Sequence, residues 1–574
     1  MSSTANASYS NASHLNASYH NASYPNASYP NASYPNTSYL IANHVIIQQL
    51  GGAKYKWTTL SHNGVMFPKE YVKHDVPVIY NGQSIILNIE AEELATLYAK
   101  YIETEYVINK IFLKNFWNDW KGYIKDDRIQ SLDGVDFSLI YQHLQKQKEL
   151  SKVETDTKTQ NKLGEEKFKF ATVDGKPQPV GNFRIEPPGI FMGRGCNPNL
   201  GRVKRRIYPE DIIINTGKES PVPEPLTGHK WKNVIHDRTV EWLASWKDDI
   251  TKKIKYVWLG AHSDLKASSD MNKFDLARKL KRKIKTIRTA NEEALKSDSK
   301  LTRQIATALY FIDKFALRVG NEKGEDEADT VGVTSLRKEH IKLAENNHVK
   351  LDFLGKDSVR FNRTLEVESQ VYMNLVEFME NKSNADQLFD LVGSADINKY
   401  LQSFMKKLTA KVFRTYNASN LFQKELRKIT NKFDKYEESD KINILLDEFN
   451  KANAKVALLC NHQKNINKST SKQIEKLDEM IKKAKTKLSK AKKSKRSTEK
   501  LNQMRDVIKK LRAKKQLKIE LKNVSLGTSK INYIDPRITI AFLKKHEIPI
   551  DKIFSKTLQE KFKWATEIDA DFQF

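Results

Sequence analysis

The sequence holds very few cysteines: Cys196 and Cys460 are the only two among 574 residues, and they lie far apart. A disulfide framework or a zinc finger needs more cysteines at closer spacing, so we exclude both and expect a reducing compartment. No run of 18 apolar residues occurs, and no basic amphipathic stretch carries a Trp or Phe face. No secretory signal is expected either, because no charged segment followed by an apolar one opens the sequence. These absences predict that the protein has no membrane partner.

Acidic residues are in short supply relative to basic ones. The sequence has 98 Lys and Arg against 70 Asp and Glu, which gives a formal net charge of +28. Such an excess favours a polyanionic partner, with nucleic acid first and an anionic membrane surface second. The length is sufficient for three or four domains with a large buried core.

Charged residues are missing from the beginning of the sequence, where none precedes Lys54. Residues 1–40 repeat Asn-Ala-Ser-Tyr with a period of five. Such a polar tract cannot build a core, so we predict a disordered tail over residues 1–54. Each repeat also matches the Asn-x-Ser acceptor for glycosylation, but that interpretation requires a secretory compartment, and the polar tail is favoured.

Mixed helix and strand patterns follow this tail. A strand-like stretch at Val76–Tyr80 ends in an Asn81-Gly82 turn, and a helix is predicted at about residues 91–107. Residues 150–167 are polar and predict a surface connection, whereas Pro, Gly and β-branched residues at 168–263 predict short strands and loops.

Helical patterns dominate after residue 263. Apolar residues recur at helical spacing from Ile305 to Val319 and again from Ile442 to Leu459. Between them, alternating Leu351 and Phe353, a Gly355-Lys356-Asp357 turn, and then Val359 and Phe361 predict a β-hairpin.

A strongly basic segment lies at residues 472–518, with 19 Lys or Arg and 5 Asp or Glu. Two narrow apolar seams, separated at about Lys492–Thr498, predict an antiparallel helical hairpin. A solvated charged arm without function is the simpler interpretation of such a segment. The positive charge of the segment nevertheless predicts salt-sensitive contact with phosphates.

A tyrosine near the end of the sequence stands just before a predicted helix. Asp535 and Pro536 are typical of an N-cap and a first helical turn, so Tyr533 lies outside a helix N-terminus. That end carries partial positive charge and unpaired N–H groups, which favour a nearby phosphate. A packing role for the tyrosine is the alternative.

The stretch Thr528-Ser529-Lys530-Ile531-Asn532-Tyr533-Ile534-Asp535-Pro536-Arg537 resembles the active-site signature of the eukaryotic-type DNA topoisomerase IB family. Other motifs of the family occur in the same order, and the resemblance covers about residues 55–574. They are Gly181-Asn182-Phe183-Arg184-Ile185-Glu186-Pro187-Pro188-Gly189, Phe311-Ile312-Asp313-Lys314, Leu317-Arg318-Val319-Gly320-Asn321-Glu322, Phe353-Leu354-Gly355-Lys356-Asp357, Lys411-Val412-Phe413-Arg414-Thr415-Tyr416-Asn417-Ala418-Ser419 and Cys460-Asn461-His462-Gln463.

The resemblance implies five catalytic residues. Tyr533 becomes the nucleophile, with Arg318, Arg414 and His462 around the phosphate and Lys356 at the leaving oxygen. This set suits the chemistry, because attack on a phosphodiester places extra charge on its non-bridging oxygens, which Arg forks and a His donor stabilise. The leaving 5′ oxygen needs a proton, which a lysine with a pKa lowered toward neutrality can supply.

Each of these residues also has a structural interpretation. Arg318 can complement a helix dipole, Lys356 can be a solvated turn residue, and Arg414 can pair with a carboxylate. His462 can be a structural hydrogen-bond donor. The catalytic interpretation is favoured because all of them occur together in family order.

Further positions are predicted to hold DNA. Arg194, Asp357 and Asn532 resemble family positions that line the cleavage site and the pocket of intercalating poisons such as camptothecin. The basic cluster Lys204, Arg205 and Arg206 is predicted to contact DNA, although such clusters also bind carboxylates. Met192 stands where the family usually has a second arginine, so one phosphate contact is expected to be missing.

No cofactor and no metal are expected. A tyrosyl phosphodiester retains the free energy of the broken backbone bond, so resealing needs no ATP, and no Gly-x-x-x-x-Gly-Lys-Ser/Thr loop occurs. The acidic residues Glu325, Asp326, Glu327 and Asp329 suggest a magnesium site as an alternative, but closely spaced loop carboxylates are mostly solvated.

The predicted fold class is α+β and multidomain: a bilobed clamp around duplex DNA with a mainly helical catalytic domain resembling tyrosine recombinases. The expected parts are a core at 55–263 with a cap lobe at about 72–149, a catalytic part at 264–465, a linker hairpin at 466–522 and a C-terminal domain at 523–574. A monomer acting in the nucleus on double-stranded DNA is expected. A viral compartment is the alternative, because the uncharged repeat replaces the charged N-terminal region of nuclear members.

Two rival functions remain. A tyrosine recombinase uses a similar Arg, Lys, His and Tyr set, but the long cap-like N-terminal half argues against it. A DNA-clamping chromatin protein without catalysis is the second, and the presence of all five candidate residues argues against that.

Overall fold

The computed structural model describes residues 55–153, 165–193, 197–321, 328–429, 438–463, 468–494 and 496–574. The chain divides into two compact units, one up to Lys266 and one from Ala267 onward. Both contain helices and strands, which confirms the mixed, multidomain fold class. Among the described residues, no helix is both long and apolar enough to cross a membrane. The predicted tail at 1–54 lies outside the described residues.

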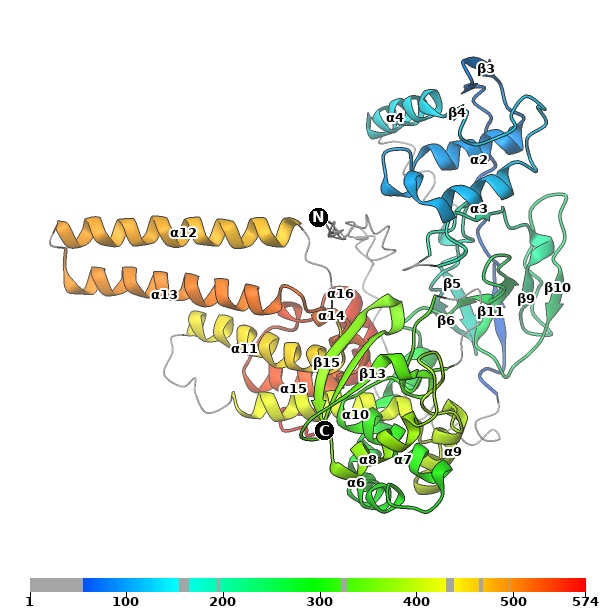
Figure 1. Ribbon diagram of the computed structural model, residues 1–574. Coiled ribbons are helices and arrows are strands. Elements are labelled where there is room, and N and C mark those ends of the chain that lie inside the picture. The colour runs from blue at the N-terminus through cyan, green and yellow to red at the C-terminus, as the bar shows by residue number, and fades with distance from the viewer. Residues whose placement is uncertain are drawn as a thin grey trace, which may run out of the picture. The chain divides into compact units, whose positions relative to one another are not determined.

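One hydrophobic cluster of the first unit gathers around three helices, α2 (Ile89–Ala99), α3 (Lys110–Trp120) and α4 (Ser138–Val153) (Figure 1). In α3 the fully buried Phe112, Phe116 and Trp120 recur every four residues, so they form the face that packs inward. The small sheet beside these helices has the order β3-β2-β4. Its strands are β2 (Val78–Tyr80), β3 (Gln83–Ile85) and β4 (Val135–Asp136).

The predicted turn between β2 and β3 is confirmed. Asn81 and Gly82 both have positive φ angles, of 46° and 83°, as a two-residue hairpin turn requires. The helix predicted at 91–107 is shorter than expected, because α2 ends at Ala99 and a separate 3₁₀ turn follows at Glu105–Ile108.

A second cluster of the first unit lies among short strands, as the sequence predicted. Three sheets have the orders β1-β5-β6, β10-β9-β11-β12 and β7-β8. Their strands are β1 (Leu60–His62), β5 (Phe170–Val173), β6 (Lys176–Pro179), β7 (Gly189–Ile190), β8 (Val203–Lys204), β9 (Ile213–Asn215), β10 (Asn233–Ile235), β11 (Trp242–Lys247) and β12 (Ile254–Trp258).

Two residues from the β7–β8 region, Ile190 and Leu200, pack in the helical cluster instead. The core of the predicted cap lobe therefore also recruits residues beyond position 149.

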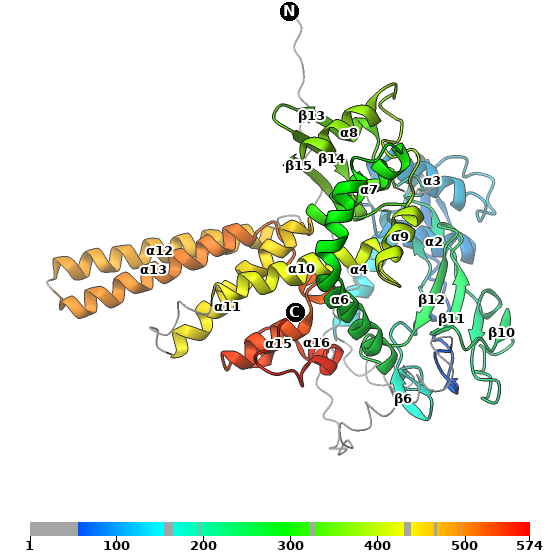
Figure 2. The same cartoon turned by 90° about the horizontal axis from the view of Figure 1, so that it is seen from below.

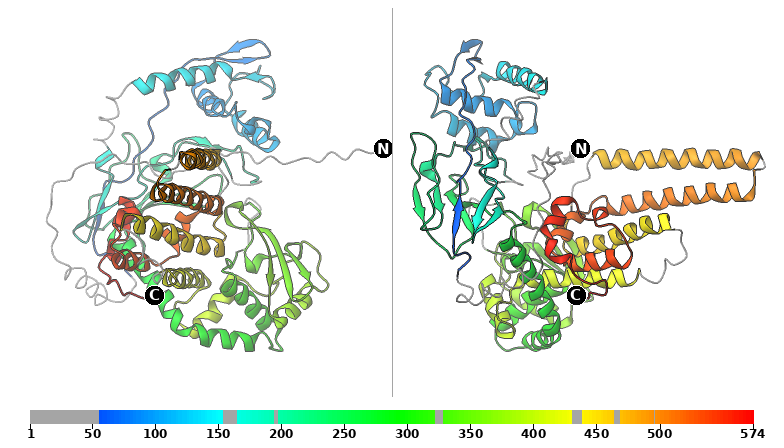
Figure 3. Two further views of the ribbon diagram at one scale, coloured as in Figure 1. Left: turned by 90° about the vertical axis from the view of Figure 1, so that its left-hand side faces the viewer. Right: turned by 180° about the vertical axis from the view of Figure 1, so that it is seen from behind.

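The second unit has one large core cluster, which extends from Ala277 to Phe574. Its helices share this core with a three-stranded antiparallel sheet of order β13-β14-β15 (Figures 2 and 3). The elements are α6 (Asp264–Ala294, which begins in the first unit), α7 (Lys300–Lys314), β13 (Ile341–Ala344), β14 (His348–Leu354), β15 (Arg360–Glu366), α8 (Ser369–Met379), α9 (Ser394–Phe404), α10 (Ala410–Arg427), α11 (Glu438–Leu459), α14 (Leu526–Asn532), α15 (Pro536–Lys545) and α16 (Lys556–Lys561).

The predicted hairpin is confirmed as β14 and β15, in which Phe353 pairs with Phe361. The helix expected across Ile305–Val319 is only partly confirmed, because α7 ends at Lys314. Ala316 then takes a φ of 50°, which a right-handed helix does not allow.

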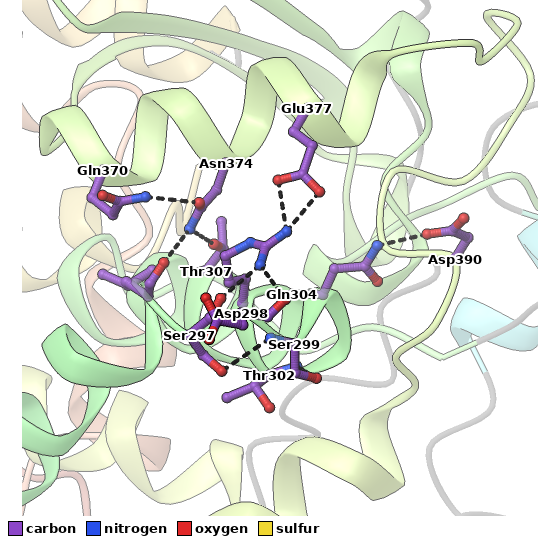
Figure 4. Close-up of polar contacts among 12 residues, drawn as sticks. Ser297, Asp298, Ser299, Thr302, Gln304, Thr307, Gln370, Asn374, Glu377 and Asp390 are labelled. Carbon is purple, nitrogen blue, oxygen red and sulfur yellow. Dashed lines mark hydrogen bonds and ion pairs between the residues drawn. The ribbon is translucent and has the colours of Figure 1, made fainter.

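A polar network joins α7 to α8 away from the hairpin (Figure 4). Arg303 donates two hydrogen bonds to Glu377, at 2.7 and 2.9 Å, and the amide of the buried Asn374 donates to Thr307 Oγ1 at 3.3 Å. Gln304, fully buried, donates to Asp390 at 2.6 Å. Because the buried Gln304 and Asn374 have hydrogen-bond partners, the network fixes how α7 packs against α8.

The basic segment forms two long helices, α12 (Lys468–Lys493) and α13 (Thr498–Leu521), which lie side by side (Figures 1 and 2). The predicted helical hairpin and the break between its arms are therefore confirmed. Lys515 of α13 bonds Asp478 of α12 at 2.6 Å.

Candidate active site

Tyr533 lies between two helices, at the end of α14 and before α15. Its amide donates to Ser529 O at 3.0 Å, and its carbonyl accepts from Ser419 Oγ at 3.0 Å. Asp535 caps α15 by accepting from the Arg537 amide at 3.0 Å, and Pro536 is the first residue of the helix, as predicted. The tyrosine is 8% exposed and belongs to the core of the second unit. Hydrogen bonds to both the amide and the carbonyl of Tyr533 thus fix its backbone.

His462 and Arg414 lie against the ring of Tyr533. The imidazole stacks on the phenol with ring centroids 5.3 Å apart and an interplanar angle of 29°. The guanidinium of Arg414 lies 5.2 Å from the centre of the same phenol ring. Arg414 Nη2 and His462 Nε2 are 3.5 Å apart. Three candidate residues, separated by up to 119 positions in the sequence, therefore meet at one place.

Arg414 is buried, and within the described ranges its side chain is held by main-chain carbonyls and not by a carboxylate. Its Nη1 donates to Ala316 O at 2.6 Å, and its Nη2 donates to Cys460 O. Its Nε has no hydrogen-bond partner among the described residues. Burial lowers the pKa of the guanidinium, and the charge of Arg318 lowers it further. A buried cation without a counter-charge favours an incoming anion.

His462 is neutral at physiological pH. Burial, reinforced by the charges of Arg414 and Arg318, lowers its pKa from 6.5 to about 3. Its Nδ1 lies 2.7 Å from Ser529 Oγ, and its Nε2 faces Arg414. The ring therefore acts as a hydrogen-bonding group, not as a second cation.

A pocket opens beside this cluster in the second unit. Its lining brings together the loop after α7, the tip of the β14–β15 hairpin, α10 and the segment that follows α11. Four of the five predicted catalytic residues line it, namely Arg318, Lys356, Arg414 and His462. Tyr533 is not among the lining residues, but its ring contacts two of them.

The loop that carries Arg318 depends on close approach of two glycines. Gly320 has a φ of 94°, and a Cβ on Gly332 would lie 2.4 Å from the Gly320 backbone. The carbonyl of Arg318 accepts from the Val333 amide at 2.9 Å. These contacts fix the backbone of the loop and thereby the position from which the arginine side chain extends.

Lys356 and Asp357 are exposed at the tip of the β14–β15 hairpin. Asp357 and the following Ser358 have φ angles of 66° and 57°, so the tip turns in a left-handed conformation. Asn532, just before the tyrosine, lies at the end of α14.

The predicted basic cluster of the first unit is paired with acidic residues. Arg205 donates to both carboxylate oxygens of Asp211, at 2.8 and 2.7 Å, and Arg206 donates to Glu93 at 2.8 Å. Lys204 lies 3.3 Å from Glu186. Contact of these residues with DNA stays a prediction, and their carboxylate partners would have to be displaced or shared.

Other predicted positions have different outcomes. Arg194 lies outside the described residues, and Met192 packs against the helical cluster of the first unit. Of the acidic group at 325–329, only Asp329 is described, and it pairs with Arg337 at 2.7 Å. No group of three potential metal ligands occurs in the described part of the chain.

Two residues near Tyr533 were given no role from the sequence alone. Ser529, inside the signature, contacts His462, and Ser419 bridges the Tyr533 carbonyl and the Asp535 amide, each at 3.0 Å. Both contacts join residues far apart in the sequence, so no local pattern could have indicated them.

The second unit thus combines a buried phenol, two arginines, a neutral histidine and an exposed lysine at one pocket. Charge-assisted donors of this kind suit a phosphodiester and the charge that develops when a nucleophile attacks it. The arrangement is typical of the class of enzymes that transfer phosphodiesters through a tyrosine.

Comparison with known families agrees with this class. Residues 55–259 match "Eukaryotic DNA topoisomerase I, DNA binding fragment", residues 262–495 match "Eukaryotic DNA topoisomerase I, catalytic core", and residues 505–574 match "C-terminal topoisomerase domain". The chain belongs to the eukaryotic DNA topoisomerase I family, which confirms the resemblance read from the sequence.

Relatives support the same assignment. DNA topoisomerase 1 alpha of Arabidopsis thaliana is 44% identical over 91% of this chain and 60% of its own length. The Caenorhabditis elegans DNA topoisomerase 1 is 43% identical over 90% of this chain and 67% of its own. The human DNA topoisomerase 1 is 42% identical over 90% of this chain and 72% of its own length. The chain thus spans about 60% of the length of the plant relative.

Proposed function

We propose that this protein is a type IB DNA topoisomerase, which relaxes positive and negative supercoils without ATP or metal. Tyr533 Oη attacks a backbone phosphorus, the bond to the 5′ oxygen breaks, and a 3′-phosphotyrosyl intermediate forms. The phenol proton passes to solvent, and Lys356 gives a proton to the departing 5′ oxygen. After the strand rotates, the 5′ hydroxyl attacks the phosphotyrosine and restores both the backbone and the free phenol.

One observation carries the proposal. Arg414 and His462 both contact the ring of Tyr533, and both line a pocket together with Arg318. Arg318, Arg414 and a neutral His462 are the groups proposed to stabilise the five-coordinate phosphorus. Arg414 suits this role because, among the described residues, its Nε has no partner and its two short hydrogen bonds go to neutral carbonyls, which leave its charge uncompensated. Preorganised donors in a buried site stabilise such a transition state more than mobile surface donors do.

The partner we propose is double-stranded DNA, held by a monomer as a bilobed clamp with a recombinase-like helical catalytic domain. Asp357 on the hairpin tip and Asn532 beside the tyrosine are proposed to contact it, together with Arg194 and the Lys204–Arg206 cluster. The proposed parts keep the boundaries predicted from the sequence, and the proposed location is the nucleus. We also propose that camptothecin traps the covalent complex between this protein and DNA. A cleavage assay in which the drug traps no such complex would contradict this part of the proposal.

Relaxation of a supercoiled plasmid in EDTA without ATP tests the proposal. The wild type and Tyr416→Phe, which changes another buried tyrosine of the same core, are expected to relax the plasmid, whereas Tyr533→Phe is not. Denaturation of the reaction should leave the protein bonded to a 3′ DNA end. Recombinant products would indicate a tyrosine recombinase, and an inactive wild type would indicate a DNA-clamping protein without catalysis.

A further inference from the structure

Ser529 is the residue that connects His462 to the nucleophile. Its side chain is fully buried, and its Oγ lies 2.7 Å from His462 Nδ1. Its carbonyl accepts from the amides of Tyr533 and Ile534, both at 3.0 Å. One residue of α14 therefore contacts the ring of the histidine and the backbone of the tyrosine.

His462 itself is placed by its main chain. Its amide donates to Ala457 O at 2.8 Å, and its carbonyl accepts from the Ser525 amide at 2.9 Å. These bonds position the ring, but they do not decide which ring nitrogen carries the proton. A neutral imidazole has one N–H donor and one acceptor, and the partner of one nitrogen sets the state of the other.

We propose that the Ser529 hydroxyl donates to His462 Nδ1 and so holds the ring in the tautomer whose Nε2–H points into the pocket. The inference rests on the proposed function, because this N–H is then available to a non-bridging oxygen of the scissile phosphate. Ser529 is a positioning residue, since it acts through His462 and does not itself line the pocket.

The competing tautomer has weaker geometric support. In that tautomer Nδ1–H would donate to Ser529 Oγ, and the buried hydroxyl hydrogen would be left without an acceptor, since Ser529 Oγ makes no other hydrogen bond in the described part of the chain. Arg414 Nη2 already donates to Cys460 O. The 3.5 Å contact between Arg414 Nη2 and His462 Nε2 lies at the limit of a hydrogen bond, so it adds little in favour of an unprotonated Nε2.

The tautomer can be measured without DNA. In ¹⁵N-histidine-labelled protein, with the His462→Gln variant used to assign its signal, Nε2 is expected to show the shift of a protonated nitrogen and Nδ1 that of an acceptor. Ser529→Ala is expected to give a mixture of the two tautomers, whereas Ser245→Ala, at a buried serine of β11 in the first unit, is the control that keeps the wild-type pattern. A wild-type ring protonated at Nδ1, or a pattern that Ser529→Ala does not change, would overturn the inference.

Cleavage kinetics supply the second test. Removal of one buried hydrogen bond is worth about a three- to tenfold change in rate, so Ser529→Ala should slow single-turnover cleavage by that factor. In a His462→Gln background the same change should have no further effect. Equal slowing in both backgrounds would show a merely structural role and overturn the inference. If the wild type never cleaved while the tautomer responded to Ser529→Ala, the proposed function would fail and the hydrogen bond would stand.

Discussion

The imidazole of His462 stacks on the phenol of Tyr533, and both rings lie within reach of one buried guanidinium, that of Arg414. The stack makes the orientation of the histidine depend on the position of α14, which ends beside the tyrosine. Changes to any of the three residues are therefore expected to affect the others, and their effects should not add.

Arg414→Lys is expected to slow single-turnover cleavage by about 100-fold or more, because a lysine cannot reproduce the planar fork. It also removes hydrogen bonds to Ala316 O and Cys460 O, so the free energy of unfolding should fall. Arg303→Lys is the matched control: it weakens the α7–α8 network, yet its rate per folded molecule should equal that of the wild type. A fast Arg414→Lys enzyme would contradict the role given to the guanidinium.

Acidification should destabilise the protein partly through His462. Its pKa is about 3 when folded, against 6.5 for an unperturbed histidine, so the unfolded chain binds more protons between these values. The stability that this group contributes is complete above pH 6.5 and decreases as the pH falls toward 3, by at most about 1.4 kcal/mol per pH unit. Urea unfolding of the wild type and His462→Gln at several pH values measures this difference, and two parallel profiles would contradict the lowered pKa.

Gly332→Ala should disturb the loop that carries Arg318. A Cβ at this position would lie 2.4 Å from the Gly320 backbone and 2.8 Å from Arg318 O, so the loop has to move. Cleavage is expected to slow by about tenfold or more, since small displacements of a positioned group are costly. Gly527→Ala is the control, because its Cβ would meet open space within a helix and should raise stability by up to about 1 kcal/mol.

The sequence predicted long, periodic elements well and short ones poorly. The stripe from Ile442 to Leu459 became α11, and the hairpin around Lys356 formed in the expected position. The end of α7 was missed because Ala316 leaves the helix with a positive φ, which no propensity of alanine indicates. Tertiary contacts decide such endings, and Arg414, which binds Ala316 O, makes one of them.

The catalytic set was predicted from family motifs rather than from local pattern. Composition alone indicated a polyanionic partner, and the cap of α15 at Asp535 indicated a helix N-terminus beside Tyr533. The state of His462 could not be predicted, because its pKa depends on burial and on two arginines that come from other parts of the chain. That basic clusters also bind carboxylates was recognised from the sequence, but the particular partners of Arg205 and Arg206 could not be identified, since they lie on other elements.

Neutralising exposed lysines of α12 should weaken the salt dependence of DNA binding. Lys483, Lys487 and Lys490 lie on one arm of the helical hairpin. If each of them binds a phosphate, the triple change to Gln should lower the slope of log K against log salt by about 0.9 for every lysine–phosphate ion pair that is removed. Lys515→Gln is the control, because that lysine is already paired with Asp478. An unchanged slope for the triple variant would mean that this arm does not bind phosphates.

Lys356→Ala tests whether the lysine supplies the proton to the leaving oxygen. With an ordinary DNA substrate, single-turnover cleavage should slow by about 100-fold or more, as for other general acids. With a sulfur atom in place of the bridging 5′ oxygen, the leaving group is a stable thiolate that needs no proton, so the variant should cleave nearly as fast as the wild type. The exposed neighbour of the same hairpin, Leu354, offers a control, since Leu354→Ala should slow neither substrate appreciably. A Lys356→Ala enzyme that is equally slow on both substrates would show that the lysine positions the DNA and does not protonate it, because binding defects do not depend on the identity of the leaving atom.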